Sequence, residues 1–145
     1  MPLSICRLTV ADYSAILDVW ELSVKATHHF LKPEEIDYYR PLILKYTLPQ
    51  VDLYGIRNTQ QELLAFIAIR DNKFEMLFVH PDYLRQKLGS SLLSLAINEH
   101  KCNRIDVNEE NPDALKVYQK FGFKQIARHS TDDCGKPHPI LELAL

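Results

Sequence analysis

The sequence predicts a single domain of the mixed α/β class, in which a sheet of about seven strands is flanked by four helices. A chain of 145 residues can bury about two-thirds of its extended surface in one core, and residues 1–145 contain no repeat or linker that would divide them. The composition, 46% hydrophobic and 25% charged, is typical of a globular protein. The expected order of elements is β-α-α-β-β-β-α-β-α-β-β. A strand meander followed by strand–helix units favours a mixed sheet with helices on its faces.

The predicted domain begins with one strand and two helical segments. Residues 4–8 alternate enough for a strand, and apolar residues at three- and four-residue steps predict a helix from residue 12 to about residue 26. The Pro-Glu-Glu at residues 33–35 marks a second helix start, because proline suits the first turn and acidic residues suit its positive end. This second pattern runs toward residue 48, and Pro41 is expected to kink or split it.

From residue 51 onward the apolar period changes to two. This change predicts three successive strands separated by turns, over residues 51–56, 63–69 and 74–79. The remaining predicted elements are a helix over 88–100, a strand over 105–107, a helix over 112–121 and a closing pair of strands over 123–127 and 140–145. Asn111 and Pro112 are a suitable cap and first turn for the last helix, and Gly122 ends it.

Charge and cysteine content exclude several classes of protein. Seventeen Lys and Arg against nineteen Asp and Glu give a net charge of −2, so no bulk field recruits nucleic acid or an anionic membrane. No apolar run approaches the roughly 20 residues that a membrane helix needs, and no signal peptide is recognised at the N-terminus. Three widely spaced cysteines, Cys6, Cys102 and Cys134, fit reduced thiols. We therefore expect a cytoplasmic protein with no nucleic-acid or membrane partner.

The most informative stretch covers residues 78–93, where a strand ends at Pro81, a basic loop follows and a helix starts at Gly89. Such an arrangement directs backbone N–H groups and a helix dipole at one spot, where an anion such as a pyrophosphate could bind. Arg85 and Lys87 add positive charge. The alternative is an ordinary strand–turn–helix with solvated basic residues, because a single glycine is weak evidence.

This stretch resembles the acetyl-CoA loop of the GCN5-related N-acetyltransferases (GNAT). A second block, residues 108–123, is similar to that family's Asn-…-Ala-…-Tyr-…-Gly-Phe segment and lies at the expected distance downstream. Residues 20–31 look like a subgroup of small bacterial members. The order of elements also agrees, so the resemblance covers essentially the whole chain. It implies a central sheet that is mixed and mostly antiparallel.

The loop departs from the family pattern at two positions. The family usually has Gln/Arg-x-x-Gly-x-Gly/Ala, whereas Leu84 stands here at the first basic position and Lys87 at the first glycine. Lysine suits that position only if the backbone φ is not strongly positive. The departures could weaken cofactor affinity, whereas Gly89 and the small Ser90 keep close approach of the backbone possible.

The resemblance implies a set of contacts to acetyl-CoA. Backbone amides from Arg85 to Ser90 are expected to hold the pyrophosphate of coenzyme A, and the strand near Leu77 to Val79 to pair with its pantetheine arm. Asn108 and Asn111 are secondary candidates, and the alternative for Asn111 is that it only caps the helix. The expected cofactor residues are Leu77, Phe78, Val79, Arg85, Gln86, Lys87, Leu88, Gly89, Ser90, Asn108 and Asn111.

Two side chains are the candidate catalytic groups. In the family, a tyrosine equivalent to Tyr118 lies beside the cofactor sulfur and protonates the departing thiolate, a role suited to a phenol. The alternative is that Tyr118 is a core aromatic packed against Val117 and Phe121, because the three residues have helical spacing. Glu75 precedes the strand segment beside the acetyl group and could take a proton from the amine, directly or through water. The alternative for Glu75 is a solvent-facing strand residue.

The acceptor amine is expected to lie beside the loop that follows the first helix. By resemblance, Thr27, His28, His29 and Phe30 line one wall of its pocket. One histidine could act as a base or contact the substrate, although such a residue more often caps or packs a turn. Polyamine, antibiotic, amino acid, peptide N-terminus and protein lysine all remain open as acceptors.

A metal site is the alternative to these assignments. His129, Cys134 and His138 are close in sequence, but their spacing matches no closed zinc pattern and residues 134–137 indicate a turn. Ser90 and Ser91 lack the Gly-x-Ser-x-Gly frame of a nucleophile elbow. We therefore expect neither a metal nor a serine nucleophile.

The resemblance implies an acetyl-CoA-dependent N-acetyltransferase that transfers the acetyl group directly to a primary amine. The expected partners are coenzyme A and an amine acceptor, and the enzyme is expected to be a monomer or a homodimer. The competing interpretation is a non-catalytic acyl-CoA-binding or regulatory module on the same fold, which the irregular residues Leu84 and Lys87 would suit. A nucleic-acid-binding domain would need a basic surplus that the chain lacks.

Overall fold

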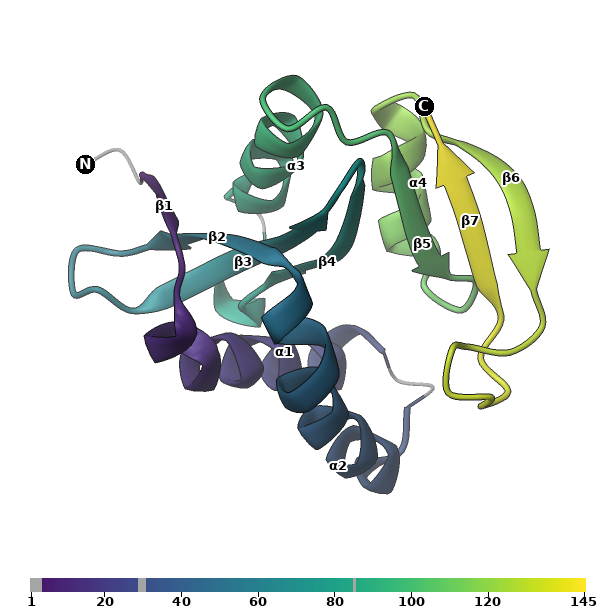
Figure 1. Ribbon diagram of the computed structural model, residues 1–145, viewed down its shortest axis with the longest axis horizontal. Helices are drawn as coiled ribbons and strands as arrows, with labels where there is room; N and C mark the ends of the chain where they lie inside the picture. Colours follow the sequence, from purple (N-terminus) through teal and green to yellow (C-terminus); the bar gives the residue numbers. More distant parts are fainter. Residues whose placement is uncertain (1–3, 29–30, 85) are drawn as a thin grey trace.

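The centre of the fold is one seven-stranded sheet. The computed structural model describes residues 4–28, 31–84 and 86–145, with strand order β1-β2-β3-β4-β5-β7-β6 (Figure 1). The strands are β1 (Ile5–Arg7), β2 (Asp52–Arg57), β3 (Leu63–Arg70), β4 (Lys73–Val79), β5 (Arg104–Asn108), β6 (Lys124–His129) and β7 (Ile140–Ala144). Neighbouring strands are antiparallel except β4 and β5, which are parallel. The predicted mixed, mostly antiparallel sheet of seven strands is confirmed.

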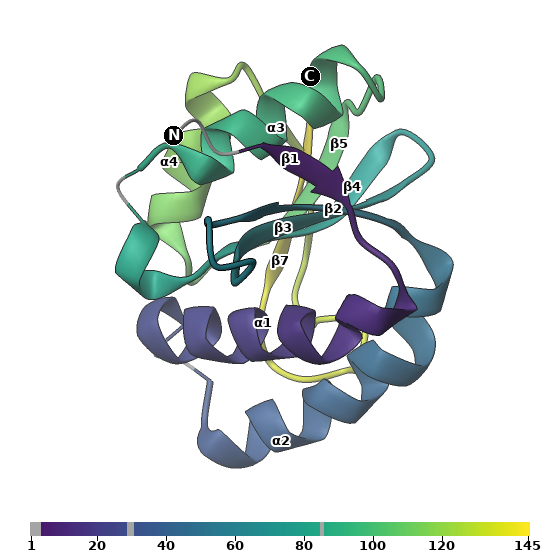
Figure 2. The same cartoon turned by 90° about the vertical axis from the view of Figure 1, so that its left-hand side faces the viewer.

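Four α-helices cover the two faces of this sheet. They are α1 (Tyr13–Thr27), α2 (Pro33–Leu42), α3 (Leu88–Asn98) and α4 (Pro112–Lys120). Figure 2 shows α1 and α2 on one face and α3 and α4 on the other. In the described ranges, no helix has both the length and the apolar character needed to cross a bilayer. All four helices were predicted from the sequence; the ends of α1, α3 and α4 lie within two residues of those expected, whereas α2 ends at Leu42 and not near residue 48.

The second helical segment changes its hydrogen-bonding pattern after Pro41, as expected. The α-helix ends at Leu42 and continues as a π-helical turn (Ile43–Thr47) and a 3-10 turn (Leu48–Gln50). Pro41 has no N–H to donate to the carbonyl one turn earlier, which weakens the regular α-helical ladder there. The chain therefore leaves α2 in irregular turns before it enters β2.

The core lies in two layers, one on each face of the sheet. Ala65, Ile67 and Ile69 of β3 pack in the cluster on the α3 and α4 side, whereas Phe66 and Ala68 pack on the α1 and α2 side. Residues 63–69 are all buried, so the expected period of two is absent from the burial of this strand. The reason is that helices cover both of its faces, as they do for central strands of α/β sheets.

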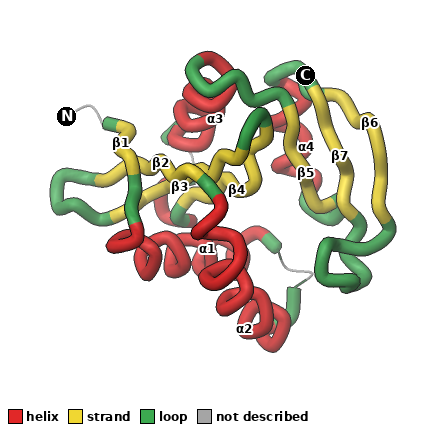
Figure 3. The backbone as a smooth tube through the Cα atoms, in the orientation of Figure 1, coloured by secondary structure: helices red, strands yellow, loops and turns green. Residues whose placement is uncertain are grey.

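A β-bulge in β4 determines where the sheet opens. Across the β3–β4 pair, Ala68 lies opposite Met76 and Ile69 opposite Phe74, so Glu75 is an extra residue without a partner on β3. On its other side β4 pairs with β5 only at Lys73 and Phe74. Bulges bend a strand and increase its twist. Beyond this point β4 and β5 separate (Figure 3), and the edge of β4 along residues 75–79 has no pairing with β5.

Candidate active site

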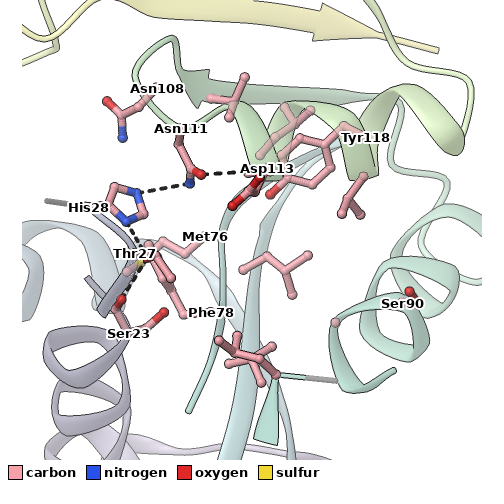
Figure 4. Close-up of a pocket in the computed structure, with 18 of the residues that line it drawn as sticks. Ser23, Thr27, His28, Met76, Phe78, Ser90, Asn108, Asn111, Asp113 and Tyr118 are labelled. Carbon is pink, nitrogen blue, oxygen red and sulfur yellow. Dashed lines mark hydrogen bonds between the residues drawn. The ribbon is translucent and has the colours of Figure 1, made fainter. Parts of the chain in front are cut away.

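A pocket of about 410 Å³ occupies the space between the separated strands. Its walls are the C-terminal half of β4, strand β5, the C-terminal end of α1, the first turn of α3, and helix α4. Figure 4 shows His28 and Ser90 on opposite sides of this space. Segments far apart in the chain therefore meet around one cavity, and the bulge at Glu75 provides the room.

Most of the site residues predicted from the sequence line this one pocket. They are Thr27, His28, Glu75, Leu77, Phe78, Val79, Lys87, Gly89, Ser90, Asn108, Asn111 and Tyr118. Two predicted cofactor residues do not line it: Gln86 is exposed, and Leu88 is buried in the hydrophobic core on the α3 side. Three others, His29, Phe30 and Arg85, lie outside the described residues.

Sequence reasoning missed several residues of the pocket. They are Ser23, Met76, Leu84, Ile105, Asp106, Val107, Asp113, Ala114 and Val117. Some of them carried a usable signal, because Ser23 lies one helical turn before Thr27 and Asp113 follows the predicted cap of α4. The residues of β5 carried no such signal in the sequence, because only the separation of β4 from β5 exposes them to the cavity.

Tyr118 is both a core aromatic and a pocket residue. Its side chain is 7% exposed, and its ring packs edge-on against Phe74 at 5.6 Å and against Phe123 at 6.3 Å between centroids. Of the two predicted neighbours, Phe121 packs against the same buried cluster, whereas Val117 is 41% exposed and lines the pocket. Aromatic pairs of this kind hold a ring in one orientation.

The hydroxyl of Tyr118 faces the pocket. Within the described residues the hydroxyl makes no hydrogen bond. Every fully buried side-chain oxygen or nitrogen there has a hydrogen-bond partner, so the Tyr118 oxygen is not fully buried and is accessible from the cavity. Figure 4 shows the ring extending from α4 toward the pocket. Burial raises the pKa of Tyr118 to about 12, because the phenolate would lose its hydration. The group is therefore a protonated hydrogen-bond donor throughout the neutral range.

Glu75 owes its position to the bulge. Its side chain is exposed, and the residue lines the pocket on the β4 side. The extra residue in the strand lets Phe74 and Met76 both point into the buried layers while Glu75 lies between them. Glu75 is therefore a solvent-facing strand residue that also lines the pocket, and its role as a base stays a prediction.

His28 links the end of α1 to the start of α4. The Asn111 side-chain oxygen accepts the backbone N–H of Ala114 at 3.4 Å, which leaves its amide nitrogen 3.4 Å from His28 Nε2. His28 Nδ1 lies 2.8 Å from the Thr27 hydroxyl, which donates to the Ser23 carbonyl at 2.7 Å (Figure 4). Because the Thr27 hydroxyl donates to Ser23, its oxygen can accept from His28 Nδ1, and the Asn111 amide nitrogen can donate to Nε2.

The loop before α3 has an uncommon backbone at Lys87. This residue is the N-cap of α3 and has φ of 61°, in the left-handed region. The positive φ is the backbone conformation to which the sequence analysis considered a lysine poorly suited. Lys87 lines the pocket together with Gly89 and Ser90 of the first turn of α3. A cation and the N-terminal end of a helix thus face the same side of the cavity.

Charge is distributed unevenly around the pocket. Three carboxylates line it, from Glu75 on β4, Asp106 on β5 and Asp113 on α4. Asp106 is paired with Lys73, whose ammonium donates to it at 2.6 Å. Among the described lining residues Lys87 is the one lysine or arginine. The α3 side therefore favours an anion, and the β4, β5 and α4 side favours a cation.

The candidate metal ligands His129, Cys134 and His138 do not form a cluster. In the described ranges no three His, Cys, Asp or Glu side chains come together as a metal site would need. His129 Nε2 lies 2.5 Å from Glu142, and His138 lies between Glu35 at 2.6 Å and Glu110 at 3.3 Å. Burial alone would lower the pKa of His138, but the hydrogen bonds and charges of Glu35 and Glu110 raise it above the usual value.

Comparison with known proteins agrees with the geometry. Residues 49–138 match the acetyltransferase (GNAT) domain family. The peptidyl-lysine N-acetyltransferase YjaB of Salmonella typhimurium is 32% identical over 143 residues, which cover 99% of this chain and 98% of that protein. The solution structure of the apo form of YjaB from Escherichia coli superposes with a TM-score of 0.88 at 32% identity, over 99% of this chain and 97% of the other.

A more distant structure shares the same fold. The PaiA N-acetyltransferase of Thermoplasma acidophilum, in complex with coenzyme A, superposes with a TM-score of 0.77 at 24% identity over the full length of both chains. The sheet order, the separated β4 and β5, and the matched domain all point to one conclusion. This chain belongs to the GNAT family of N-acetyltransferases.

Proposed function

We propose that this enzyme transfers the acetyl group of acetyl-CoA to the ε-amino group of lysine side chains in peptides or proteins. The observation that carries the proposal is the pocket between β4 and β5, which has the buried Tyr118 hydroxyl facing it and carboxylates on the same side. The name of the YjaB relative, a peptidyl-lysine N-acetyltransferase, supports the choice of acceptor.

Acetyl-CoA would lie along the free edge of β4. Beyond Phe74 this edge has no backbone partner on β5, so the amides of the pantetheine arm can pair with residues 75–79 as an added strand would. The pyrophosphate would then meet the backbone N–H groups at the start of α3, near Gly89 and Ser90. This placement puts the thioester between the two strands, beside Tyr118.

The reaction would be a direct transfer. The neutral amine attacks the thioester carbonyl, a C–N bond forms, and the C–S bond breaks as the tetrahedral intermediate collapses. Glu75 takes the proton of the amine, directly or through water, since its carboxylate lines the pocket and is open to solvent. Tyr118 donates a hydrogen bond to the sulfur as it becomes a thiolate. A thiolate formed in this buried site also has a raised pKa, which brings it closer to that of the phenol.

The acceptor would enter from the α1 side. Thr27 and His28 form this wall, and His28 keeps its ring in place through Asn111 and Thr27. His28 contacts or positions the substrate rather than serving as the base, because its accepting nitrogen already faces the Asn111 amide. The carboxylates of Glu75 and Asp113 favour an acceptor that arrives as a cation, as lysine does at neutral pH.

The thiols fit a cytoplasmic enzyme. Cys6, Cys102 and Cys134 are all free, which is usual where thiols are kept reduced. We propose that the enzyme acts there as a monomer or a homodimer.

The test is steady-state turnover with a defined acceptor panel. The purified protein is assayed for thiol release from acetyl-CoA with an N-terminally blocked lysine peptide, the same peptide carrying arginine in place of lysine, spermidine, and free lysine. We expect turnover with the lysine peptide and none with the arginine peptide. Mass spectrometry should place the acetyl group on the ε-nitrogen of the lysine. Coenzyme A binding without turnover of any amine would instead support the non-catalytic module. Turnover confined to spermidine would contradict the acceptor assignment.

A further inference from the structure

The chain from the end of α1 to the start of α2 is tied to the turn between β5 and α4 at two points. At the first point, His28 Nε2 lies 3.4 Å from the amide nitrogen of Asn111. At the second point, Glu35 in the first turn of α2 lies 2.6 Å from His138 Nε2, and His138 Nδ1 lies 3.3 Å from Glu110. Glu110 and Asn111 are neighbours in the turn. The same two segments are therefore joined once through His28 and once through His138.

His138 belongs to a third segment, the loop between β6 and β7, which lies beside the start of α2 (Figure 1). The backbone of this loop also holds the turn, because the carbonyl of Pro139 accepts the N–H of Glu109 at 2.9 Å. The Glu109 carboxylate accepts two more hydrogen bonds, at 2.7 and 3.0 Å, from Arg128 of β6. Strands β6 and β7 thus fix the turn from one side, and His138 links it to α2 on the other.

The two contacts of the ring require His138 to be a cation. Ionised carboxylates accept hydrogen bonds and do not donate them, so the nitrogens that face Glu35 and Glu110 must both donate. Burial alone would lower the pKa of His138, but the two carboxylates raise it above its usual value, in agreement with this state. The pKa of Glu35 is lowered by the hydrogen bond to His138 and further by the charge of Lys136, on the loop of His138.

Burial makes this bridge strong. The side chain of His138 is 9% exposed and that of Glu35 is 16% exposed. Hydrogen bonds between ionised groups are stronger than those between neutral groups, and removal from water strengthens them further. The bridge is therefore able to fix the distance between α2 and the turn.

The two linked segments form one side of the pocket. The residues that line the pocket there, which we call the acceptor wall, are Thr27, His28, Asn108 and Asn111. Their contacts make the wall one unit, because the Asn111 side chain caps α4 at Ala114 while its amide meets His28. A displacement of the turn would therefore move both the start of α4 and the partner of His28.

We propose that the His138 cation is a positioning residue for the acceptor amine: by binding Glu35 and Glu110, it holds the acceptor wall in the arrangement that receives the lysine side chain. His138 does not line the pocket, so it acts through the wall and not on the substrate. A neutral imidazole has one N–H and can keep only one of the two carboxylates. The wall should therefore loosen when His138 loses its proton. The inference rests on the proposed function, because it requires the amine to enter from the α1 side.

Two variants break the bridge, and a third is a matched control. Glu110→Ala removes one carboxylate and should fold, because the Glu110 side chain is 39% exposed. His138→Gln leaves a side chain that can donate from one nitrogen only. The control is His129→Gln, because His129 also lies against a carboxylate, 2.5 Å from Glu142, but does not line the pocket or contact the acceptor wall.

The first measurement is steady-state kinetics with acetyl-CoA and the blocked lysine peptide. We expect His138→Gln and Glu110→Ala to raise the KM for the peptide about tenfold, with the KM for acetyl-CoA and kcat within about threefold of the parent. The double variant should resemble His138→Gln alone, because both changes break the same bridge. His129→Gln should stay within about twofold of the parent in every constant. Equal changes in the two KM values would overturn the proposal.

The pH profile separates positioning by the cation from a merely structural role. The useful quantity is the peptide KM of Glu110→Ala divided by that of the parent, because ionisation of the amine cancels in this ratio. The ratio should fall toward one as the pH rises from about 6.5 to about 9, since the parent then loses the second donor of His138. A ratio that stays constant or rises would contradict the proposal.

NMR provides a readout that needs no turnover. The ring signals of His28 should shift in Glu110→Ala and in His138→Gln, and keep their parent positions in His129→Gln. Unchanged His28 signals in folded Glu110→Ala would overturn the proposal while leaving acetyl transfer in place. Shifted signals in a protein that turns over no amine would contradict the proposed function, and the positioning of an amine with it.

Discussion

Gly89→Val should separate cofactor binding from folding. Gly89 is the second residue of α3, and a Cβ added there would meet Val79 Cγ2 at 3.6 Å, an ordinary contact. Its φ is not positive, so a side chain is compatible with the backbone. Valine is a better helix former than glycine by about 0.4 kcal/mol, which for a domain of this size shifts the melting temperature upward by only about 1 °C. Folding should therefore be unaffected.

Binding should respond very differently. The branched side chain would project from a residue that lines the pocket, where the pyrophosphate is proposed to approach the backbone. Loss of one hydrogen bond to a charged group costs about 1.5–3 kcal/mol, which corresponds to about a 10- to 150-fold weaker affinity for coenzyme A. Calorimetry measures the affinity and thermal melting the stability. Gly89→Ala, which adds only the Cβ, should keep most of the affinity.

Gly55→Ala provides the opposite pattern. Its new Cβ would lie 2.8 Å from side-chain carbons of Leu63 and Leu8 and 3.0 Å from the Ala65 carbonyl oxygen, so the core must shift. We expect a loss of stability of about 1–3 kcal/mol with unchanged coenzyme A affinity, since Gly55 does not line the pocket. A folded Gly89→Val variant that binds coenzyme A as tightly as the parent would refute the placement of the cofactor.

Three further predictions follow from the site and its surroundings. His28→Ala should raise the KM for the amine far more than that for acetyl-CoA, and equal effects on both would make its role structural. His138→Gln should cost most stability at about pH 4.5–6.5, measured by urea unfolding. The pKa of His138 is raised, so its contribution to folding stability is lost as the pH rises. The pKa of Glu35 is lowered by its hydrogen bond to His138, so the contribution of Glu35 to folding stability is lost as the pH falls. A difference that grows toward pH 9 would contradict this pairing. A thiol reagent should modify the exposed Cys134 in the folded protein and Cys102 only on unfolding, because burial raises the pKa of Cys102 to about 11.

Local signals in the sequence were sufficient to predict the elements of the fold. Pro33 begins α2, and Asn111 caps α4 by accepting the Ala114 N–H, as their positions before apolar helical patterns predicted. Such signals act within a few residues and need no knowledge of tertiary contacts. The order of strands and helices follows from them, and the likeness of two blocks to one family then indicated the topology.

The features that shape the site depend on tertiary pairing and could not be predicted locally. The bulge at Glu75 exists only in the register between β3 and β4, and the pocket exists only because β5 leaves β4 after two residues. His28 and Asn111 are 83 residues apart in the chain, so nothing local joins them. The left-handed Lys87 contradicts local preference, as residues at functional sites sometimes do.

The role of Tyr118 is the central claim, and the turnover of Tyr118→Phe tests it most directly. The variant keeps the ring against Phe74 and Phe123 and removes a hydroxyl that has no hydrogen-bond partner within the described residues, so folding should be unchanged. Loss of a general acid typically costs about 10²–10⁴-fold in rate. With chemistry shown to be rate-limiting, kcat should fall at least about tenfold while coenzyme A affinity stays the same. A kcat within about twofold of the parent would contradict the account and leave Tyr118 as a core aromatic.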